Sequence, residues 1–289
     1  MVNITGKTIL ITGATSGIGL ATAYALAEKG ASIVLAGRNE VRSQQAAIKI
    51  RQTTSNNRVD YILADLSSQA DIRKMAQEYL RRYDQLDVLI NNAGAHFFKR
   101  QLSQDHIEMT FAVNHLAPFL LTNLLLPQLL AAAHNTGEAR VINVSSNGHF
   151  GGQLDFSDLM FERRPYFFGW PAYKQSKLSN VLFSAELDRR LQGSQVRSFS
   201  LHPGLVPTNI FKLDDGILKS IVKIFVKRFG ISEQAGALTS IYLASAPDVI
   251  SEGGKYFEKC RPVAADAASQ DKEMSAHLWQ ISSTLTNLN

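Results

Sequence analysis

The stretch most suited to chemistry in this sequence is Tyr173-Lys174-Gln175-Ser176-Lys177, written YKQSK. A tyrosine and a lysine four residues apart lie on the same face of a helix. A phenol near an ammonium group could give or take a proton, because the cation should lower the phenol pKa from its ordinary value of about 10. The same spacing also occurs in neutral surface pairs, so the pattern needs support from other motifs.

A second motif, TGATSGIG at 12–19, joins an apolar run to an amphipathic one. Glycines let a backbone approach phosphates closely, and the free amides and dipole of a following helix attract their charge. A glycine-rich turn between a buried strand and a helix therefore predicts binding of a dinucleotide pyrophosphate. The residues expected around the cofactor are Gly13, Thr15, Ser16, Gly17, Ile18 and Gly19.

The end of the second apolar run indicates which dinucleotide is bound. NAD sites carry an acidic residue near this point, which grips the ribose hydroxyls. Here the sequence has Gly37-Arg38-Asn39. Arg38 is a planar cation able to bind a 2′-phosphate, so with Asn39 beside it NADP is favoured. A solvated surface arginine is the alternative.

Two further strand ends supply cofactor candidates. Asp65, followed by Leu66, could accept a hydrogen bond from the adenine amino group or cap the next helix, and the two roles are compatible. Asn92, Ala93 and Gly94 lie in the run NNAG, where small residues let a backbone pass close to a ligand or turn sharply.

The elements that position these motifs alternate along the chain. Strands are predicted at 8–12, 32–36, 59–64, 88–90, 140–144, 197–200 and 255–257, and amphipathic helices at 18–29, 41–52 and 69–83. Continuous apolar strands separated by helices indicate a parallel sheet covered on both faces. No repeat or linker marks a boundary, so residues 1–289 are predicted to form one α/β, doubly wound Rossmann domain.

Composition narrows the classes of protein. The 289 residues are 45% hydrophobic and 19% charged, which is ordinary for a globular protein and excludes disorder. The net charge of +5 is spread along the chain, which argues against nucleic acid as a partner. The single cysteine, Cys260, suits a reducing compartment, and a cytoplasmic location is expected. No signal peptide is visible, and two prolines make 116–133 a buried helix pair rather than a membrane span.

Taken together, the motifs resemble those of the short-chain dehydrogenase/reductase family. The matching stretches, in the family's order over 7–208, are TGATSGIG, Asp65-Leu66, NNAG, Asn114 in FAVNHLAPF, VINVSS, YKQSK and HPGLVPT. The later segments GGKYFEKC and AHLWQISSTL are similar to the retinol dehydrogenase and protochlorophyllide reductase-like branch. The resemblance implies seven parallel strands with NADP(H) along their carboxyl edge.

The resemblance also implies a catalytic tetrad of Asn114, Ser146, Tyr173 and Lys177. In the pair Ser145-Ser146, the family's pattern favours Ser146 as the residue that hydrogen-bonds the substrate oxygen. Tyr173 would exchange the proton, and Lys177 would also hold the nicotinamide ribose. Asn114 would hold a water that links Lys177 to solvent.

Residues after the sixth strand complete the site implied by the family. Pro203, Val206 and Thr208 are expected around the nicotinamide, whereas His202 is expected only to end the strand. No cluster of His, Cys and Asp has metal-ligand spacing, so no catalytic metal is predicted.

Two segments bear on the substrate. Aromatic residues concentrate in 147–172, at Phe150, Phe156, Phe161, Tyr166, Phe167, Phe168 and Trp170. They could wall an apolar pocket or merely pack the loop down, and both interpretations stay open. The segment 205–231 is predicted to be a lid over the substrate. Its basic part, 216–231, could also contact an anionic membrane surface or be an ordinary packed helix.

The predicted function is that of an NADP(H)-dependent oxidoreductase that transfers hydride between nicotinamide and the carbonyl or alcohol of an apolar substrate. A retinoid-, steroid- or lipid-like aldehyde or ketone would fit. One alternative is a C=C reductase of the protochlorophyllide reductase type. A non-catalytic NADP-binding regulatory protein is a third reading, and the complete tetrad argues against it. A homodimer could form through 116–133 and 171–191, as in relatives.

Overall fold

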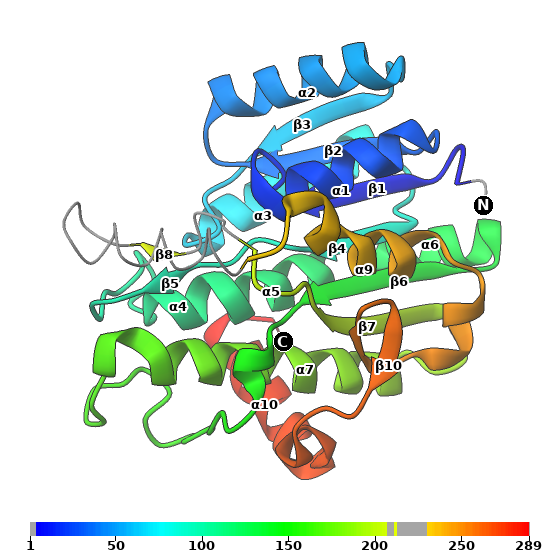
Figure 1. Cartoon of the computed structure of the whole chain (residues 1–289). Helices are drawn as coiled ribbons and strands as arrows, with labels where there is room; N and C mark the ends of the chain where they lie inside the picture. The colour runs from blue at the N-terminus through cyan, green and yellow to red at the C-terminus, as the bar shows by residue number, and fades with distance from the viewer. Residues whose placement is uncertain (1–3, 207–210, 213–229, 289) are drawn as a thin grey trace.

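The computed structural model describes residues 4–206, 211–212 and 230–288 (Figure 1). Its central sheet has the strand order β10-β9-β7-β6-β4-β1-β2-β3. The strands are β1 Thr8–Thr12, β2 Ser32–Gly37, β3 Val59–Leu63, β4 Val88–Asn91, β6 Ala139–Val144, β7 Val196–His202, β9 Tyr256–Glu258 and β10 Arg261–Val263. A separate pair, β5 His96–Phe97 with β8 Phe211–Lys212, is parallel.

Seven of the eight strands are parallel, as predicted. The eighth, β10, was not predicted, and it pairs antiparallel with β9. Its three residues are all exposed. A three-residue edge strand that contains a proline carries no apolar run, so the sequence has no signal for it.

Helices cover both faces of the sheet because successive strand residues point to opposite sides. Ile9 and Ile11 pack into one buried cluster, and Leu10 packs into the other. The first cluster involves α1 Gly17–Glu28, α2 Glu40–Thr54 and α9 Glu233–Ser245. The second involves α3 Gln69–Arg82, α5 Ala117–Leu124, α6 Leu126–Thr136 and α7 Trp170–Arg190. The predicted doubly wound α/β fold is confirmed.

The topology fixes where a site can form. Strand β1 lies between β2 and β4, so the chain first runs outward to β3 and then crosses back to β4. Loops after β1 and β4 therefore diverge at the carboxyl edge of the sheet, and such a crevice is where open α/β sheets bind ligands.

The C-terminal helix α10, Lys272–Leu285, lies across α7 (Figure 1). Its Trp279 ring meets the ring of Phe119 edge-on, with 4.9 Å between the centroids. The guanidinium of Arg190 lies 4.3 Å above the same tryptophan ring. Part of the apolar surface that was predicted to pair two subunits is thus covered by the chain's own helix.

Among the described residues, no single helix is long and apolar enough to cross a membrane. The segments Met109–Leu124 and Leu126–Thr136 reach that length and composition only together, and they are bent by 56°.

Candidate active site

A cavity of about 780 Å³ lies at the carboxyl edge of the sheet. The predicted cofactor residues that line it are Gly13, Thr15, Ser16, Gly17, Ile18, Gly19, Arg38, Asn39, Asp65, Leu66, Asn92, Ala93, Gly94, Pro203 and Val206. Ser146, Tyr173 and Lys177 line the same cavity. Asn114 is fully buried behind its wall. Thr208 lies outside the described residues.

The glycine-rich turn packs directly on the NNAG run. Gly13 has φ +65°, and a Cβ there would lie 3.0 Å from Ala93 Cα. A Cβ on Gly19 would lie 2.4 Å from Asn92 Nδ2. The hydroxyl of Thr12 accepts hydrogen bonds from the amides of Asn92 and Ala93, each at 3.0 Å. A larger residue at either glycine would push the glycine-rich turn and the NNAG run apart.

The start of α1 is free to bind an anion. Ser16 occupies the N-cap position, yet its side chain makes no capping hydrogen bond. The first amides of the helix therefore keep their hydrogen-bonding capacity toward the cavity, where the helix dipole adds positive potential. The turn and these amides fit a dinucleotide pyrophosphate.

Two arginines lie at one end of the cavity. Arg38 is exposed and lines it, as does Arg42 in the first turn of α2. Asn39 caps α2, because its Oδ1 accepts from the Arg42 amide at 2.9 Å. Its side chain therefore has a structural role, whereas the two guanidinium groups can meet a phosphate.

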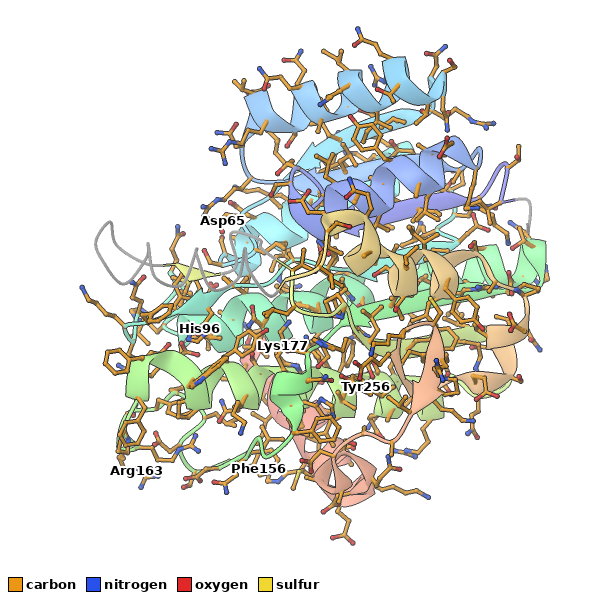
Figure 2. All side chains as sticks on the ribbon, in the orientation of Figure 1. Asp65, His96, Phe156, Arg163, Lys177 and Tyr256 are labelled. Carbon is orange, nitrogen blue, oxygen red and sulfur yellow. The ribbon has the colours of Figure 1, made fainter. Side chains whose placement is uncertain are left out.

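Asp65 is held in a local turn. Its Oδ1 accepts from the Ser67 amide at 2.9 Å and from the Ser67 hydroxyl at 2.8 Å. The cap of α3 is Ser68, whose hydroxyl accepts from the Asp71 amide. The prediction that Asp65 could cap this helix is thus wrong, because a serine nearer the helix does so. Both bonds of Asp65 use Oδ1, so Oδ2 is the oxygen that could meet an adenine amino group (Figure 2 labels Asp65).

The two adjacent serines after β6 have different surroundings. Ser145 is buried, and its hydroxyl donates to the carbonyl of Lys177 at 2.7 Å. Ser146 is partly exposed, accepts from the Gly148 amide at 3.0 Å and is hydrogen-bonded to Tyr173. The structure therefore places Ser146, the serine chosen from the sequence, beside the phenol.

Tyr173 and Lys177 lie together on α7, as their spacing predicts. Lys177 Nζ is 5.7 Å from the centroid of the Tyr173 ring and donates to the carbonyl of Val144 at 2.9 Å. Burial lowers the pKa of Lys177 to about 8. Burial also raises the pKa of Tyr173, and the hydrogen bond with Ser146 only partly opposes this. The prediction that Lys177 brings the Tyr173 pKa below its ordinary value is wrong for the protein alone, because desolvation dominates both groups.

Asn114 lies in a π-helical turn, Ala112–Leu116, a form that often occurs at functional sites. Its amide donates to the Ala95 carbonyl at 2.9 Å and to the Ser176 hydroxyl at 3.0 Å. Its Oδ1 accepts from the Ala95 amide at 2.8 Å. Both amide hydrogens are used, so only Oδ1 can receive a further donor. A Cβ on Gly94 would lie 3.4 Å from this oxygen and 3.3 Å from Lys177 Nζ, so the two groups are neighbours.

Several apolar side chains outside the predicted cofactor residues also line the cavity. Phe97, Met109, Val113 and Leu205 line the cavity together with the polar Gln101. Of the described residues around the cavity, none is an aromatic residue of the loop 147–172.

The aromatic residues of that loop divide between packing and exposure. Phe161 packs perpendicular to Tyr166 at 5.8 Å, which supports the packing interpretation for these two. Phe167 and Phe168 are 67% and 72% exposed and fit neither interpretation. The Phe156 ring packs against the His277 ring, tilted by 31° with 4.2 Å between the centroids. Figure 2 shows Phe156 away from Lys177.

The predicted lid 205–231 is described only at 205–206, 211–212 and 230–231. The amide of Ile231 donates to the carbonyl of Leu205 at 2.8 Å, so the described ends of the lid meet at the cavity. Residues 216–229 of the basic segment lie outside the described residues.

Comparison with known proteins matches residues 7–157 to the family model described as short chain dehydrogenase. Human retinol dehydrogenase 13 is 40% identical over 99% of this chain and 86% of its own length. The chain belongs to the short-chain dehydrogenase family. It is therefore an oxidoreductase, and its resemblance to the retinol dehydrogenase branch is confirmed.

Solved structures of other short-chain dehydrogenases and of an uncharacterised protein have the same fold. The uncharacterised protein, from Mycobacterium paratuberculosis, has a TM-score of 0.79 and 32% identity, covering 99% of this chain and 96% of that one. A short chain dehydrogenase from Escherichia coli CFT073, complexed with NADPH, has a TM-score of 0.66 and 23% identity, covering 88% and 97%.

In this short-chain dehydrogenase, several cavity residues were not found from the sequence. Arg42 adds a second cation, and Met109 and Val113 add apolar surface. The buried Thr12 is not a lining residue, but its hydroxyl fixes the NNAG run. Arg42 follows Arg38 by four residues, a spacing that could have drawn attention to it. Met109 and Val113 have the same spacing, but they sit in an apolar stretch where it signals only a buried helix face.

Proposed function

We propose that this protein is an NADP(H)-dependent oxidoreductase that transfers hydride between nicotinamide and the carbonyl or alcohol of an apolar substrate. Tyr173 is the proton donor in one direction and the acceptor in the other. The observation that carries the proposal is the meeting of the Tyr173 phenol, the Ser146 hydroxyl and the Lys177 amine on one cavity. The rest of that cavity fits a dinucleotide.

The choice of NADP(H) is supported by charge at the far end of the cavity. Arg38 and Arg42 both line it, and a 2′-phosphate would give them a doubly charged partner. The Escherichia coli relative in complex with NADPH supports the same cofactor. The uncapped amides of α1 would hold the pyrophosphate between the arginines and the catalytic end.

When bound, the nicotinamide ring supplies or accepts the hydride. In the reducing direction, the Ser146 hydroxyl donates a hydrogen bond to the substrate carbonyl oxygen and stabilises the charge that develops on it. Tyr173 gives its proton to that oxygen, so the carbonyl gains one hydride and one proton and becomes an alcohol. Oxidation reverses these steps.

Lys177 supports Tyr173 after the proton has left. A tyrosinate beside an ammonium group forms an ion pair, and the low dielectric of the buried site strengthens it. Asn114 Oδ1, next to Lys177 Nζ across Gly94, can accept a hydrogen bond from a donor that carries protons to the lysine. The water-holding role of Asn114 stays a prediction.

An apolar substrate is favoured by apolar side chains that line the same cavity as Tyr173. Phe97, Met109, Val113 and Leu205 offer carbon surface to a ligand whose oxygen points at Tyr173. The retinol dehydrogenases among the relatives support a retinoid-like molecule, and steroid- or lipid-like aldehydes and ketones have similar surface chemistry. Membrane contact through 216–231, a homodimer and a cytoplasmic location stay predictions.

The test is the Tyr173→Phe variant, assayed with retinaldehydes, steroid ketones, and aliphatic and aromatic aldehydes at the NADPH absorbance band. We expect turnover to fall by about 10³-fold or more, because the proton donor is lost. The Kd for NADPH, measured by fluorescence titration, should change less than about threefold, or about 0.6 kcal/mol.

The matched control is Tyr166→Phe. It removes the same hydroxyl from a tyrosine that binds Glu108 at 2.8 Å and does not line the cavity. This variant should keep its turnover. Unchanged turnover in Tyr173→Phe would refute the mechanism, and a product with a reduced C=C bond would assign the C=C reductase alternative.

A further inference from the structure

The turn that carries Ser146 is attached to the far end of the chain. His149, three residues later, is fully buried. Its Nδ1 lies 2.7 Å from the carbonyl oxygen of Ser146, and its Nε2 lies 3.1 Å from the backbone nitrogen of Asp266. A carbonyl only accepts and an amide only donates, so the ring carries its proton on Nδ1 and is neutral. Burial lowers the pKa of His149, in agreement with a neutral ring.

Asp266 makes a second link to the same loop. Its Oδ2 accepts from the Gly151 amide at 2.7 Å, and its Oδ1 accepts from the Ala268 amide at 2.9 Å. The Gly151 and Ala268 amides lower the pKa of Asp266, so the carboxylate is charged at neutral pH. The segment 264–270 is therefore bound to the loop after β6 through both the backbone amide and the carboxylate of Asp266.

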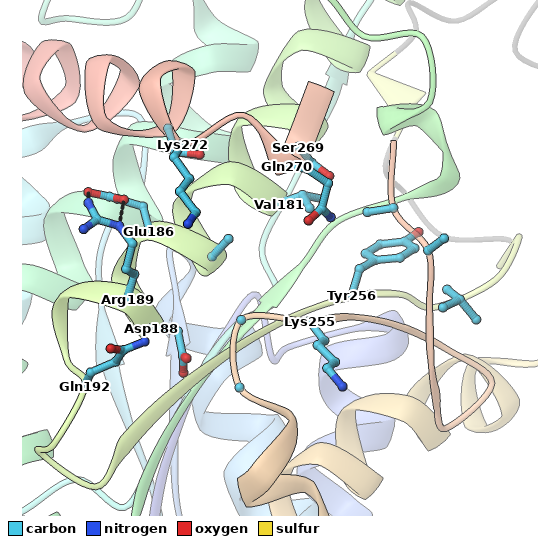
Figure 3. Close-up of a pocket in the computed structure, with 17 residues that line it drawn as sticks. Val181, Glu186, Asp188, Arg189, Gln192, Lys255, Tyr256, Ser269, Gln270 and Lys272 are labelled. Atoms are coloured by element: carbon cyan, nitrogen blue, oxygen red, sulfur yellow. Dashed lines mark hydrogen bonds and ion pairs between the residues drawn. The ribbon is translucent and has the colours of Figure 1, made fainter. Parts of the chain in front are cut away.

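The segment 264–270 lies between the Ser146 turn, with the neighbouring Tyr256, and a second cavity. Tyr256 donates its hydroxyl to Asn147 Oδ1 at 2.8 Å, and its ring lies 4.5 Å from that of His149. On the other side, Tyr256 and Ser269 line a second cavity of about 510 Å³ (Figure 3). The segment packs on the core through Ala268, and its hydrogen bonds to His149 and Gly151 tie it to the Ser146 turn on the side away from the open space.

We infer that His149 is a positioning residue for Ser146, and that the segment 264–270 sets the direction of the serine hydroxyl through it. The inference rests on the proposed function, in which Ser146 holds the substrate oxygen beside Tyr173. The Ser146 carbonyl accepts from the His149 ring and also from the His149 backbone amide at 3.0 Å. Without the ring, only the backbone amide holds this carbonyl, and the turn gains freedom to rotate. A shift of a fraction of an ångström at a catalytic hydroxyl is enough to slow proton and hydride transfer.

Three variants separate the two hydrogen bonds of the ring. His149→Phe keeps a ring and removes both bonds. His149→Asn places an amide nitrogen near the Nδ1 position, where it can still donate to Ser146. His149→Gln places its amide near the Nε2 position, where it can still accept from Asp266. We expect His149→Phe to lower kcat by about tenfold, His149→Asn to recover most of that loss, and His149→Gln to recover little.

Binding and folding are measured beside kcat. The KM and Kd for NADPH should stay within about twofold in all three variants, because His149 does not line the cofactor cavity. The matched control is His134→Phe, at an exposed position on α6, which should keep its kcat. A purely structural role predicts instead that kcat follows the melting temperature whichever hydrogen bond remains.

A double-mutant cycle tests the part played by the C-terminal segment. Asp266→Ala should lower kcat by itself, and in the His149→Phe background it should lower kcat by a smaller factor, because both changes release the same segment. Equal kcat in the Asn and Gln variants, or wild-type kcat in His149→Phe, would overturn the inference while leaving the proposed function intact. Failure of the wild-type enzyme to reduce any carbonyl while it binds NADPH would instead overturn the proposed function.

Discussion

Replacing Lys177 with methionine should stabilise the protein at neutral pH while removing its activity. The lysine is 2% exposed, and burial lowers its pKa from 10.5 to about 8. A pKa difference of this size corresponds to about 3 kcal/mol. That free energy is the cost of keeping the lysine charged in the folded protein at pH 7. Methionine keeps a chain of similar length without the charge.

The lost hydrogen bond from Lys177 Nζ to Val144 reduces the gain by about 1 kcal/mol. We therefore expect Lys177→Met to raise the free energy of unfolding at pH 7 by about 2 kcal/mol. The stability advantage of the variant falls as pH rises from about 8 towards 10.5. Above the folded pKa of about 8 and below 10.5, the unfolded chain binds more protons than the native one, so the wild type gains stability as pH rises. By about pH 9.5 the advantage of the variant should be close to zero.

Urea unfolding at about pH 7 and about pH 9.5, followed by tryptophan fluorescence, measures both values. The control is Lys74→Met, since the side chain of Lys74 is 78% exposed. It should change stability by less than about 0.5 kcal/mol at both pH values. If Lys177→Met is less stable than the wild type at neutral pH, and by the same amount at the higher pH, the buried ammonium carries no net cost and the reasoning is refuted.

Two further substitutions test the cofactor end and the core beneath the site. Arg38→Asp should lower the ratio of kcat/KM for NADPH over NADH by about ten- to a hundredfold, since it replaces a charge-assisted contact with repulsion. The control is Arg81→Asp, which makes the same change of charge at an exposed position away from the cavity and should leave this ratio unchanged. An unchanged ratio in Arg38→Asp would contradict the phosphate role of Arg38. Asn143→Ala should cost about 3 kcal/mol in urea unfolding, because its side chain accepts from Asn91 at 2.8 Å and donates to Ser184 at 2.7 Å in a fully buried position. The exposed Asn135→Ala is its control, and equal small losses in both would show that the buried network contributes little.

The strand ends around the cavity could be predicted because they follow from local patterns. Apolar runs mark the buried strands, and the carboxyl ends of parallel strands meet at one edge of the sheet. Gly13, Asn92, Ser146 and Pro203 follow four different strands and line one cavity, although they are far apart in sequence. Family resemblance then selected Ser146 over Ser145, and the separate hydrogen bonds of the two serines agree with that choice.

Features that depend on distant packing could not be predicted. The direction of the Tyr173 pKa was wrong because a sequence shows the neighbouring charge of Lys177 but not how deeply both groups are buried. The contact between His149 and Asp266 joins positions 117 apart in sequence, and no sequence motif predicts it. The exposed edge strand β10 lacks the apolar run that marks the other strands.

The two pKa shifts at the catalytic end also bear on the direction of the reaction. At neutral pH the raised pKa of Tyr173 keeps the phenol protonated, while Lys177, with a pKa of about 8, is still largely charged. Carbonyl reduction starts from this state, because the phenol holds the proton to be given. The tyrosinate that results gains an ammonium neighbour, and the two titrations are then coupled. In the proposed mechanism, alcohol oxidation must first ionise this buried phenol, and desolvation opposes that step even though Lys177 offers a countercharge. We therefore expect the proposed mechanism to run more readily as reduction at neutral pH, and the oxidation rate to rise as increasing pH makes proton removal from Tyr173 easier.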